Sequence, residues 1–98
     1  NLPTAIFAAS DNAALGALRA LHENNLSVPE DISIIGFDGI ESTEFSTPSL
    51  TTISQPRLEM GEESVALMMK LISNDQLLER KMTLDFSFIK RESVQSKK

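Results

Sequence analysis

The chain has 98 residues, 41% of them hydrophobic and 23% charged, with a formal net charge of -5 at pH 7. This composition excludes a disordered chain and is typical of a soluble globular unit with one small core. Lys and Arg cluster only at 90–91 and 97–98, so the chain carries no electrostatic footprint for nucleic acid. The absence of cysteine excludes disulfides and thiolate chemistry.

The first part of the chain predicts a strand, a helix and a second strand. Residues 5–9 are a short apolar run typical of a strand. The Ala- and Leu-rich residues 13–23 predict a helix, in which Gly16 is expected to allow close approach to the sheet. Between this strand and this helix lie three residues of the types that cap helix N-termini: Ser10, Asp11 and Asn12. Residues 32–37 are mostly apolar, which indicates a central strand of a parallel sheet with both faces covered.

The rest of the chain predicts a turn, two strands and a long helix. Residues 39–45 form a weak helical turn or loop, and 50–54 alternate as expected of an edge strand. Residues 57–73 carry apolar side chains at intervals of three and four, which predicts an amphipathic helix. A charged loop is expected at 76–81, followed by a half-exposed strand at 82–89.

Polar side chains follow the first two predicted strands at their carboxyl ends. Ser10 and Asp11 follow one strand, and Asp38 ends the other. Adjacent parallel strands should bring these residues to one edge of the sheet, where open α/β sheets bind small molecules. Helix capping is the simpler explanation of Ser10 and Asp11, however, and a turn with Gly39 explains Asp38 as readily as ligand binding does.

Enzyme chemistry has little support in the residue pattern. His22 is the only histidine and is expected on the surface of a helix. The sequence contains no nucleophile elbow, no Gly-rich phosphate loop and no His/Cys ligand pair. Asp11, Asp38 and Asp85 are a weak signal for a metal cluster, because Asp85 lies in a remote strand. We therefore predict no catalytic residue, no metal and no cofactor.

Three stretches of the chain resemble the LacI/GalR family of bacterial transcription regulators. They read PTAIFAASDNAALGALRAL at 3–21, VPEDISIIGFDGIESTEFSTPSLTTISQPRLEMG at 28–61 and RES at 91–93. The resemblance implies an α/β fold with a parallel sheet flanked by helices, as a fragment of the type I periplasmic-binding-protein-like fold. Residues 1–55 would belong to the C-terminal lobe, 56–84 would supply a crossover, helix and strand of the N-terminal lobe, and 85–98 would return to the C-terminal lobe.

The resemblance also implies roles for individual residues. Asp38 matches the family's effector-binding aspartate, and Gln55 matches a glutamine of the cleft. Ser10 lies where several relatives have an effector-contacting Asn, and the adjacent acid, Asp11, is predicted to bind ligand with it. Five positions match the dimer interface: Leu15, Leu18, Arg19, His22 and Phe45. The family usually has Asp or Asn where this chain has Gly39, so the identity of the effector stays open.

The implied function is effector sensing in a cytoplasmic regulator of the repressor type. A small polar effector would bind in the cleft between the lobes, and the protein would form a homodimer. Sugars are the first candidates for this effector, with purines, nucleosides or a phosphorylated partner protein as alternatives. Operator DNA would be bound only through an upstream headpiece absent from this chain. No apolar run approaches the roughly 20 residues of a membrane span, so no membrane partner is expected.

Two alternatives remain for the class of protein. A solute-binding protein of a sugar transporter would share the same fold, and the upstream sequence would distinguish it by a signal peptide in place of a helix-turn-helix. A small flavodoxin-like enzyme or signalling domain is the third possibility. It fits less well, because the order of the strands and the long late helix do not match.

Overall fold

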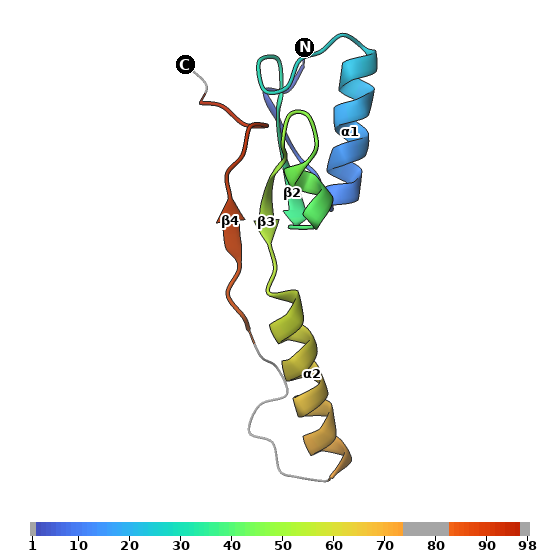
Figure 1. The fold of residues 1–98 in the computed structure, drawn as a ribbon, viewed down its shortest axis with the longest axis vertical. Coiled ribbons are helices and arrows are strands. Elements are labelled where there is room, and N and C mark those ends of the chain that lie inside the picture. The colour runs from blue at the N-terminus through green and yellow to red at the C-terminus, as the bar shows by residue number, and fades with distance from the viewer. Residues whose placement is uncertain (1, 74–82, 97–98) are drawn as a thin grey trace. The chain divides into compact units, whose positions relative to one another are not determined.

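The computed structural model describes residues 2–73 and 83–96 (Figure 1). Its elements run in the order β1 (Ala5–Phe7), α1 (Asp11–Glu23), β2 (Ser33–Asp38), the 3-10 turn η1 (Glu41–Glu44), β3 (Thr51–Ser54), α2 (Arg57–Ile72) and β4 (Ser87–Ile89). The chain divides into two compact units, Asn1–Ser54 with Ser87–Lys98 and Gln55–Phe86. The assignment of the predicted segments to two lobes stays a prediction.

The sheet of the first unit has four strands in the order β1-β2-β3-β4. β2 pairs in parallel with β1 and with β3, whereas β4 pairs with β3 in the antiparallel direction (Figure 1). The predicted α/β class is therefore confirmed, with a mixed sheet in place of a purely parallel one. The prediction that 50–54 form an edge strand is wrong, because β4 returns along the free side of β3.

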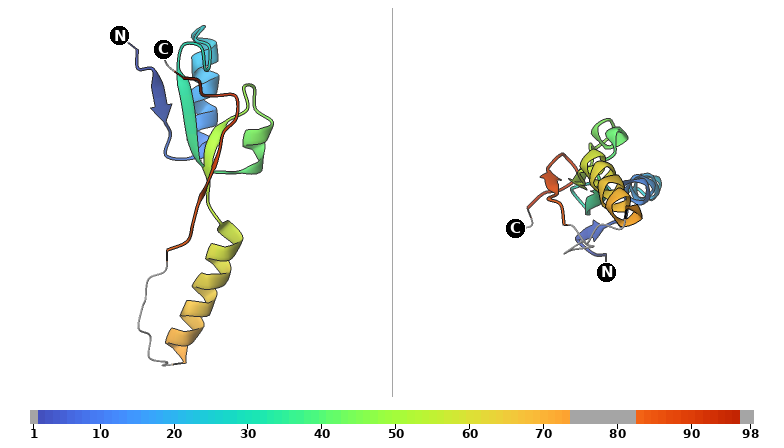
Figure 2. Two further views of the ribbon diagram at one scale, coloured as in Figure 1. Left: turned by 90° about the vertical axis from the view of Figure 1, so that its left-hand side faces the viewer. Right: turned by 90° about the horizontal axis from the view of Figure 1, so that it is seen from below.

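α1 packs against one face of the sheet, beside β2 (Figure 2). The core between them contains Ala8, Ala14, Ile32, Ile34 and Leu50, all buried. On the other face Ile35 and Phe37 are only half-buried, so the expectation that β2 is covered on both faces does not hold within this chain. The expected role of Gly16 is also wrong: it is exposed, and a Cβ there would have no atom within 4 Å.

Most predicted element boundaries differ from the structure by a few residues. β1 ends two residues earlier than expected because the chain bends at Ala9 and Ser10 before α1; the Ala8 amide still donates to the Ile35 carbonyl oxygen at 2.9 Å. The strand expected at 82–89 is confined to Ser87–Ile89, where β3 provides a partner; residues 83–86 form no strand, and Met82 lies outside the described residues. The loop expected at 76–81 also lies outside them.

The segment after β4, residues 90–96, links β2 and β3 through hydrogen bonds. Ser93 is fully buried, and its hydroxyl donates to the Ile34 carbonyl oxygen at 2.6 Å while accepting from the Thr51 amide at 2.9 Å. The Ile34 amide in turn donates to the Ser93 carbonyl oxygen at 2.9 Å. Arg91 donates from Nη1 to the Leu50 carbonyl oxygen at 3.0 Å. These bonds satisfy buried backbone groups that would otherwise lose their hydrogen bonds to water.

Glu92 adds a pH-dependent contact to this junction. Its Oε1 accepts hydrogen bonds from the backbone N and the Oγ of Ser49, each 3.0 Å long. The backbone bond first, and the side-chain bond second, hold the pKa of Glu92 below its ordinary value of 4.5. A carboxyl with a lowered pKa in the folded state adds stability above the unfolded value, and loses it as the pH falls through the folded pKa.

Replacing Glu92 with Gln should therefore lower the free energy of unfolding slightly at neutral pH and not at pH values below the folded pKa. Denaturant titrations of both proteins across this pH range measure the difference. Ser49→Ala removes the hydroxyl donor and should reproduce part of the effect. An equal difference between wild type and Glu92→Gln at every pH would contradict the assignment.

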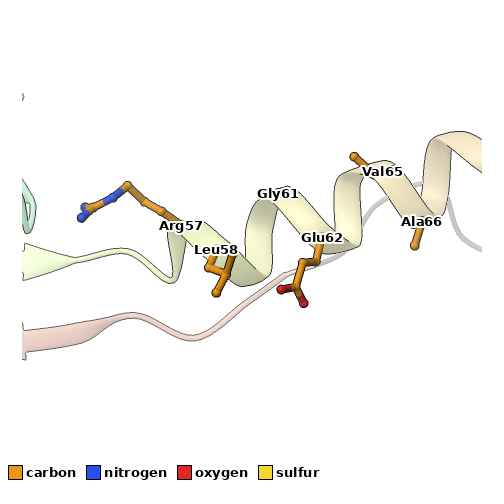
Figure 3. A pocket seen from close by; sticks show the side chains of 6 residues that line it. All are labelled: Arg57, Leu58, Gly61, Glu62, Val65 and Ala66. Atoms are coloured by element: carbon orange, nitrogen blue, oxygen red, sulfur yellow. The ribbon is translucent and has the colours of Figure 1, made fainter.

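α2 lies in the second unit and confirms the amphipathic helix expected at 57–73. None of its residues is buried, although Leu58, Val65 and Ile72 follow the helical spacing of an apolar face; they are 78%, 63% and 66% exposed. Figure 3 shows the start of this helix, where six residues line a shallow pocket: Arg57, Leu58, Gly61, Glu62, Val65 and Ala66.

Candidate functional site

The carboxyl ends of β1 and β2 meet at one edge of the sheet, as their parallel pairing requires. Ser10 follows β1 and is the N-cap of α1: its Oγ accepts a hydrogen bond from the Ala13 amide at 3.1 Å. Helix capping is thus confirmed for Ser10. The residue is half-buried, and its hydroxyl hydrogen stays available to donate, because the bond to Ala13 uses the oxygen as acceptor.

Asp11, the first residue of α1, joins three elements through its buried carboxylate. Its Oδ2 accepts hydrogen bonds from the backbone amides of Gly39 and Ile40, at 2.7 and 2.8 Å. Its Oδ1 accepts from the Thr52 hydroxyl of β3 at 2.6 Å. Burying a carboxylate is costly unless such bonds replace its water shell. The predicted convergence of the two strand ends is confirmed, and Asp11 is the residue that connects them.

Gly36 provides the space that the Asp11 carboxylate occupies. This glycine is buried in β2, and a Cβ at this position would overlap Asp11 Oδ1 and lie 2.9 Å from the Leu50 side chain. The apolar strand therefore needs a residue without a side chain where the helix N-terminus crosses it. A side chain at position 36 and the Asp11 carboxylate in its present place would exclude each other.

The chain turns sharply at the end of β2. Asp38 has a φ of 134° and Gly39 a φ of 80°, both in the region that L-residues with side chains rarely adopt. Such a conformation at a non-glycine residue costs about 1–3 kcal/mol and persists only where neighbouring contacts hold it. A Cβ on Gly39 would lie 2.7 Å from Ser54 Cα, so the end of β3 approaches this turn closely. Asp38 itself is half-buried.

The remaining predicted ligand residue, Gln55, directly follows β3 and is half-buried. It belongs to the second compact unit, whereas Ser10, Asp11 and Asp38 belong to the first. The structure thus brings three of the four predicted ligand residues to one edge. Ligand binding by all four stays a prediction.

Four of the five predicted dimer residues lie together on α1. They line a pocket of about 420 Å³ together with two residues of the loop after η1. The lining residues are Leu15, Leu18, Arg19, His22, Ser46 and Thr47. The fifth, Phe45, is the C-cap residue that follows η1 and is 73% exposed. Arg19 also pairs with Glu23 on the helix surface at 3.5 Å.

Sequence reasoning did not identify Thr52 or Gly36 as residues that contact Asp11. Thr52 stands between Thr51 and Ile53 in a β-rich segment, so the sequence does not mark it as buried, and its partner Asp11 lies 41 positions away. Within 2–73 and 83–96 the structure contains no group of three or more His, Cys, Asp or Glu placed to hold a metal ion. A search of the same residues finds no helix long and apolar enough to cross a membrane.

The chain forms an α/β domain with polar residues at the carboxyl ends of parallel strands, the place where open α/β sheets generally bind ligands. Residues 1–94 match the family described as periplasmic binding protein-like domain. The chain therefore belongs to this family, and it corresponds to part of the effector-binding core of LacI/GalR-type regulators.

Three similar proteins illustrate this relationship. The HTH-type transcriptional regulator MalR of Clostridium butyricum is 47% identical over 90 residues, which are 92% of this chain and 27% of that protein. A crystal structure of the lac repressor dimer bound to operator and the anti-inducer ONPF is 37% identical, with a TM-score of 0.88 over 97% of this chain and 33% of its own. A complex of the transcriptional regulator CelR with cellobiose is 34% identical, with a TM-score of 0.85 over 92% of this chain and 28% of its own.

The chain thus spans about a third or less of the length of these proteins. By their names they are transcriptional regulators and a repressor, and none of them is an enzyme, in agreement with the prediction from sequence.

Proposed function

We propose that this chain forms part of the effector-binding core of a cytoplasmic, DNA-binding transcriptional regulator of the repressor type. The observation that carries the proposal is the edge where Ser10 and the Asp38–Gly39 turn are held together by the Asp11 carboxylate. The similarity to the operator-bound lac repressor supports the regulatory role. DNA would be bound by a headpiece outside these residues, because the chain itself is acidic.

The effector that this edge fits best is a small molecule with several hydroxyl groups, a sugar before a nucleoside or purine. The Asp38 carboxylate can accept hydrogen bonds from two neighbouring hydroxyls, and the Ser10 hydroxyl can donate to a third oxygen. Gln55, which directly follows β3, would add a further polar contact to the effector. Support for a sugar comes from the similar CelR, whose structure contains cellobiose.

Asp11 differs from the other three proposed ligand residues. Its oxygens already accept three hydrogen bonds from Gly39, Ile40 and Thr52, and the residue is fully buried. These bonds favour an indirect part in binding over contact with the effector.

Effector binding would act on DNA through the relative closure of the two lobes. A ligand shifts such an equilibrium only by its difference in affinity for the two states, so the sugar must bind one closure state more tightly than the other. The same difference in free energy then appears as altered affinity for operator DNA.

Calorimetry on the full-length protein tests the proposal with D-ribose, D-galactose, cellobiose, adenosine and hypoxanthine. We expect at least one sugar to bind, and to change the retention of genomic DNA fragments on the immobilised protein. Sugar binding without any retention of DNA would instead support the solute-binding alternative. If none of the five compounds binds, the result would contradict the proposal that the effector is a small polar molecule.

The surface formed by Leu15, Leu18, Arg19, His22 and Phe45 is proposed as the dimer interface. Phe45 is the best probe of it, because its exposure makes a charge there harmless to the isolated fold. Phe45→Glu is expected to convert the full-length dimer to monomers in sedimentation experiments. Ala20→Glu, an exposed charge elsewhere on α1, serves as the control and should leave the dimer intact. A dimer that survives Phe45→Glu would place the interface elsewhere.

A further inference from the structure

We propose that Asp11 is a positioning residue for the effector site, acting on Asp38 through the backbone of the Asp38–Gly39 turn. The inference rests on the proposed binding role of Asp38 and assigns Asp11 a separate task. Asp11 would hold the turn in its positive-φ conformation before any effector arrives, so that the direction of the Asp38 carboxylate is already set.

The hydrogen bonds of the turn amides converge on one oxygen atom. The amides of Gly39 and Ile40 both point at Asp11 Oδ2, at 2.7 and 2.8 Å. These are the two amides immediately after Asp38. Two adjacent amides can share one acceptor only when the intervening backbone turns back on itself, so the bonds fix the dihedral angles around Gly39.

The turn after β2 needs such a restraint. The positive φ of Asp38, 134°, is unfavourable for a residue with a side chain, and the chain would relax toward extended backbone without opposing contacts. Gly39 can follow either geometry because it lacks a Cβ. Asp11 therefore supplies a restraint that the local sequence does not.

Asp11 is itself held rigidly. It begins α1 directly after the Ser10 cap, its carboxylate is fully buried, and its second oxygen is held by the Thr52 hydroxyl at 2.6 Å. A site on such a support loses less conformational entropy on binding than one on a free loop. Hydrogen bonds to a carboxylate are also roughly twice as strong as those between neutral groups.

The test compares three variants of the full-length protein: Asp11→Ala, Asp11→Asn and Thr52→Val. Asp11→Ala removes every acceptor, whereas Asp11→Asn keeps one oxygen for the turn amides and can donate its NH2 to Thr52. Thr52→Val removes a buried partner of Asp11 but leaves Oδ2 and the turn amides in place. It is the matched control for a merely structural role.

Amide hydrogen exchange in the absence of effector is the first measurement. We expect Asp11→Ala to accelerate exchange at Gly39 and Ile40 at least tenfold more than at Ile34, whose amide bonds to Ser93 at the other end of the sheet. Asp11→Asn should recover most of this protection. If Asp11→Ala does not fold, Asp11→Asn should still accelerate these two amides more than Thr52→Val does. Equal acceleration at all three amides, or a larger effect from Thr52→Val, would overturn the proposal.

The dissociation constants of D-ribose, D-galactose and cellobiose are the second measurement. For whichever of them binds the wild type, Asp11→Ala should raise the dissociation constant at least tenfold and Thr52→Val less than threefold. Unchanged sugar affinity in Asp11→Ala would overturn the positioning role. If none of the three sugars binds the wild type, the proposed sugar effector fails, while the exchange rates still decide whether Asp11 sets the turn.

Discussion

Replacing Asp38 with Asn in the full-length protein is expected to weaken effector binding roughly 10- to 100-fold. The substitution keeps the shape of the side chain but turns one of two acceptor oxygens into a donor, and it removes the charge. Hydrogen bonds to a charged group contribute about 1.5–3 kcal/mol, and each 1.4 kcal/mol is a factor of about ten in affinity. The positive φ at this position tolerates Asn at least as well as Asp, so the fold should be preserved.

Calorimetry with the sugar that binds the wild type measures this loss. The matched control is Asp31→Asn, which changes a carboxylate that accepts a backbone hydrogen bond from Ser27 at 2.7 Å in the turn before β2. This turn lies at the opposite end of the strand from Asp38, and the control should bind with unchanged affinity. Equal affinity in wild type and Asp38→Asn would remove Asp38 from the effector site.

Gly36→Ala is expected to destabilise the protein by about 3 kcal/mol, a large effect for one methyl group. The new Cβ would overlap the Asp11 carboxylate and press on Leu50, so the carboxylate has to leave its three hydrogen bonds or the strand has to shift. Overpacking a core costs about 1–3 kcal/mol, and disturbing a buried, hydrogen-bonded carboxylate adds to this.

Gly16→Ala is the matched control, because the same methyl group enters open space on the exposed side of α1. Alanine is favoured over glycine within a helix by about 1 kcal/mol, so this variant should be slightly more stable than the wild type. Denaturant unfolding should give a lower free energy of unfolding than the wild type for Gly36→Ala and a slightly higher one for Gly16→Ala. Similar stabilities for both would show that the contact between Gly36 and Asp11 does not limit the fold.

Local patterns predicted most of the secondary structure. The Ala- and Leu-rich helix with its Ser10 cap and the amphipathic helix at 57–73 both formed, because periodicity and capping depend on neighbouring residues. The convergence of the two strand ends also followed, because it requires only that β1 and β2 are adjacent and parallel.

The direction and extent of the last strand could not be predicted in the same way. Alternation at 82–89 continues beyond the three residues for which β3 provides a partner, and alternation does not tell parallel from antiparallel pairing. The burial of Asp11 could not be predicted either, because it depends on partners that are distant in the sequence. Its partners Gly39, Ile40 and Thr52 lie 28, 29 and 41 positions away, and next to Ser10 it resembles a solvent-exposed helix start.

The central claim is that the edge formed by Ser10 and the Asp38–Gly39 turn binds a small polar effector. Amide chemical shifts of the isotope-labelled full-length protein, followed during titration with the tightest-binding of the five compounds, test it most directly. The account predicts that the largest changes fall at 10–12 and 38–40, with the turn at 27–31 unmoved. Changes centred on the α1 surface around Leu18 and His22, with 38–40 unaffected, would contradict it.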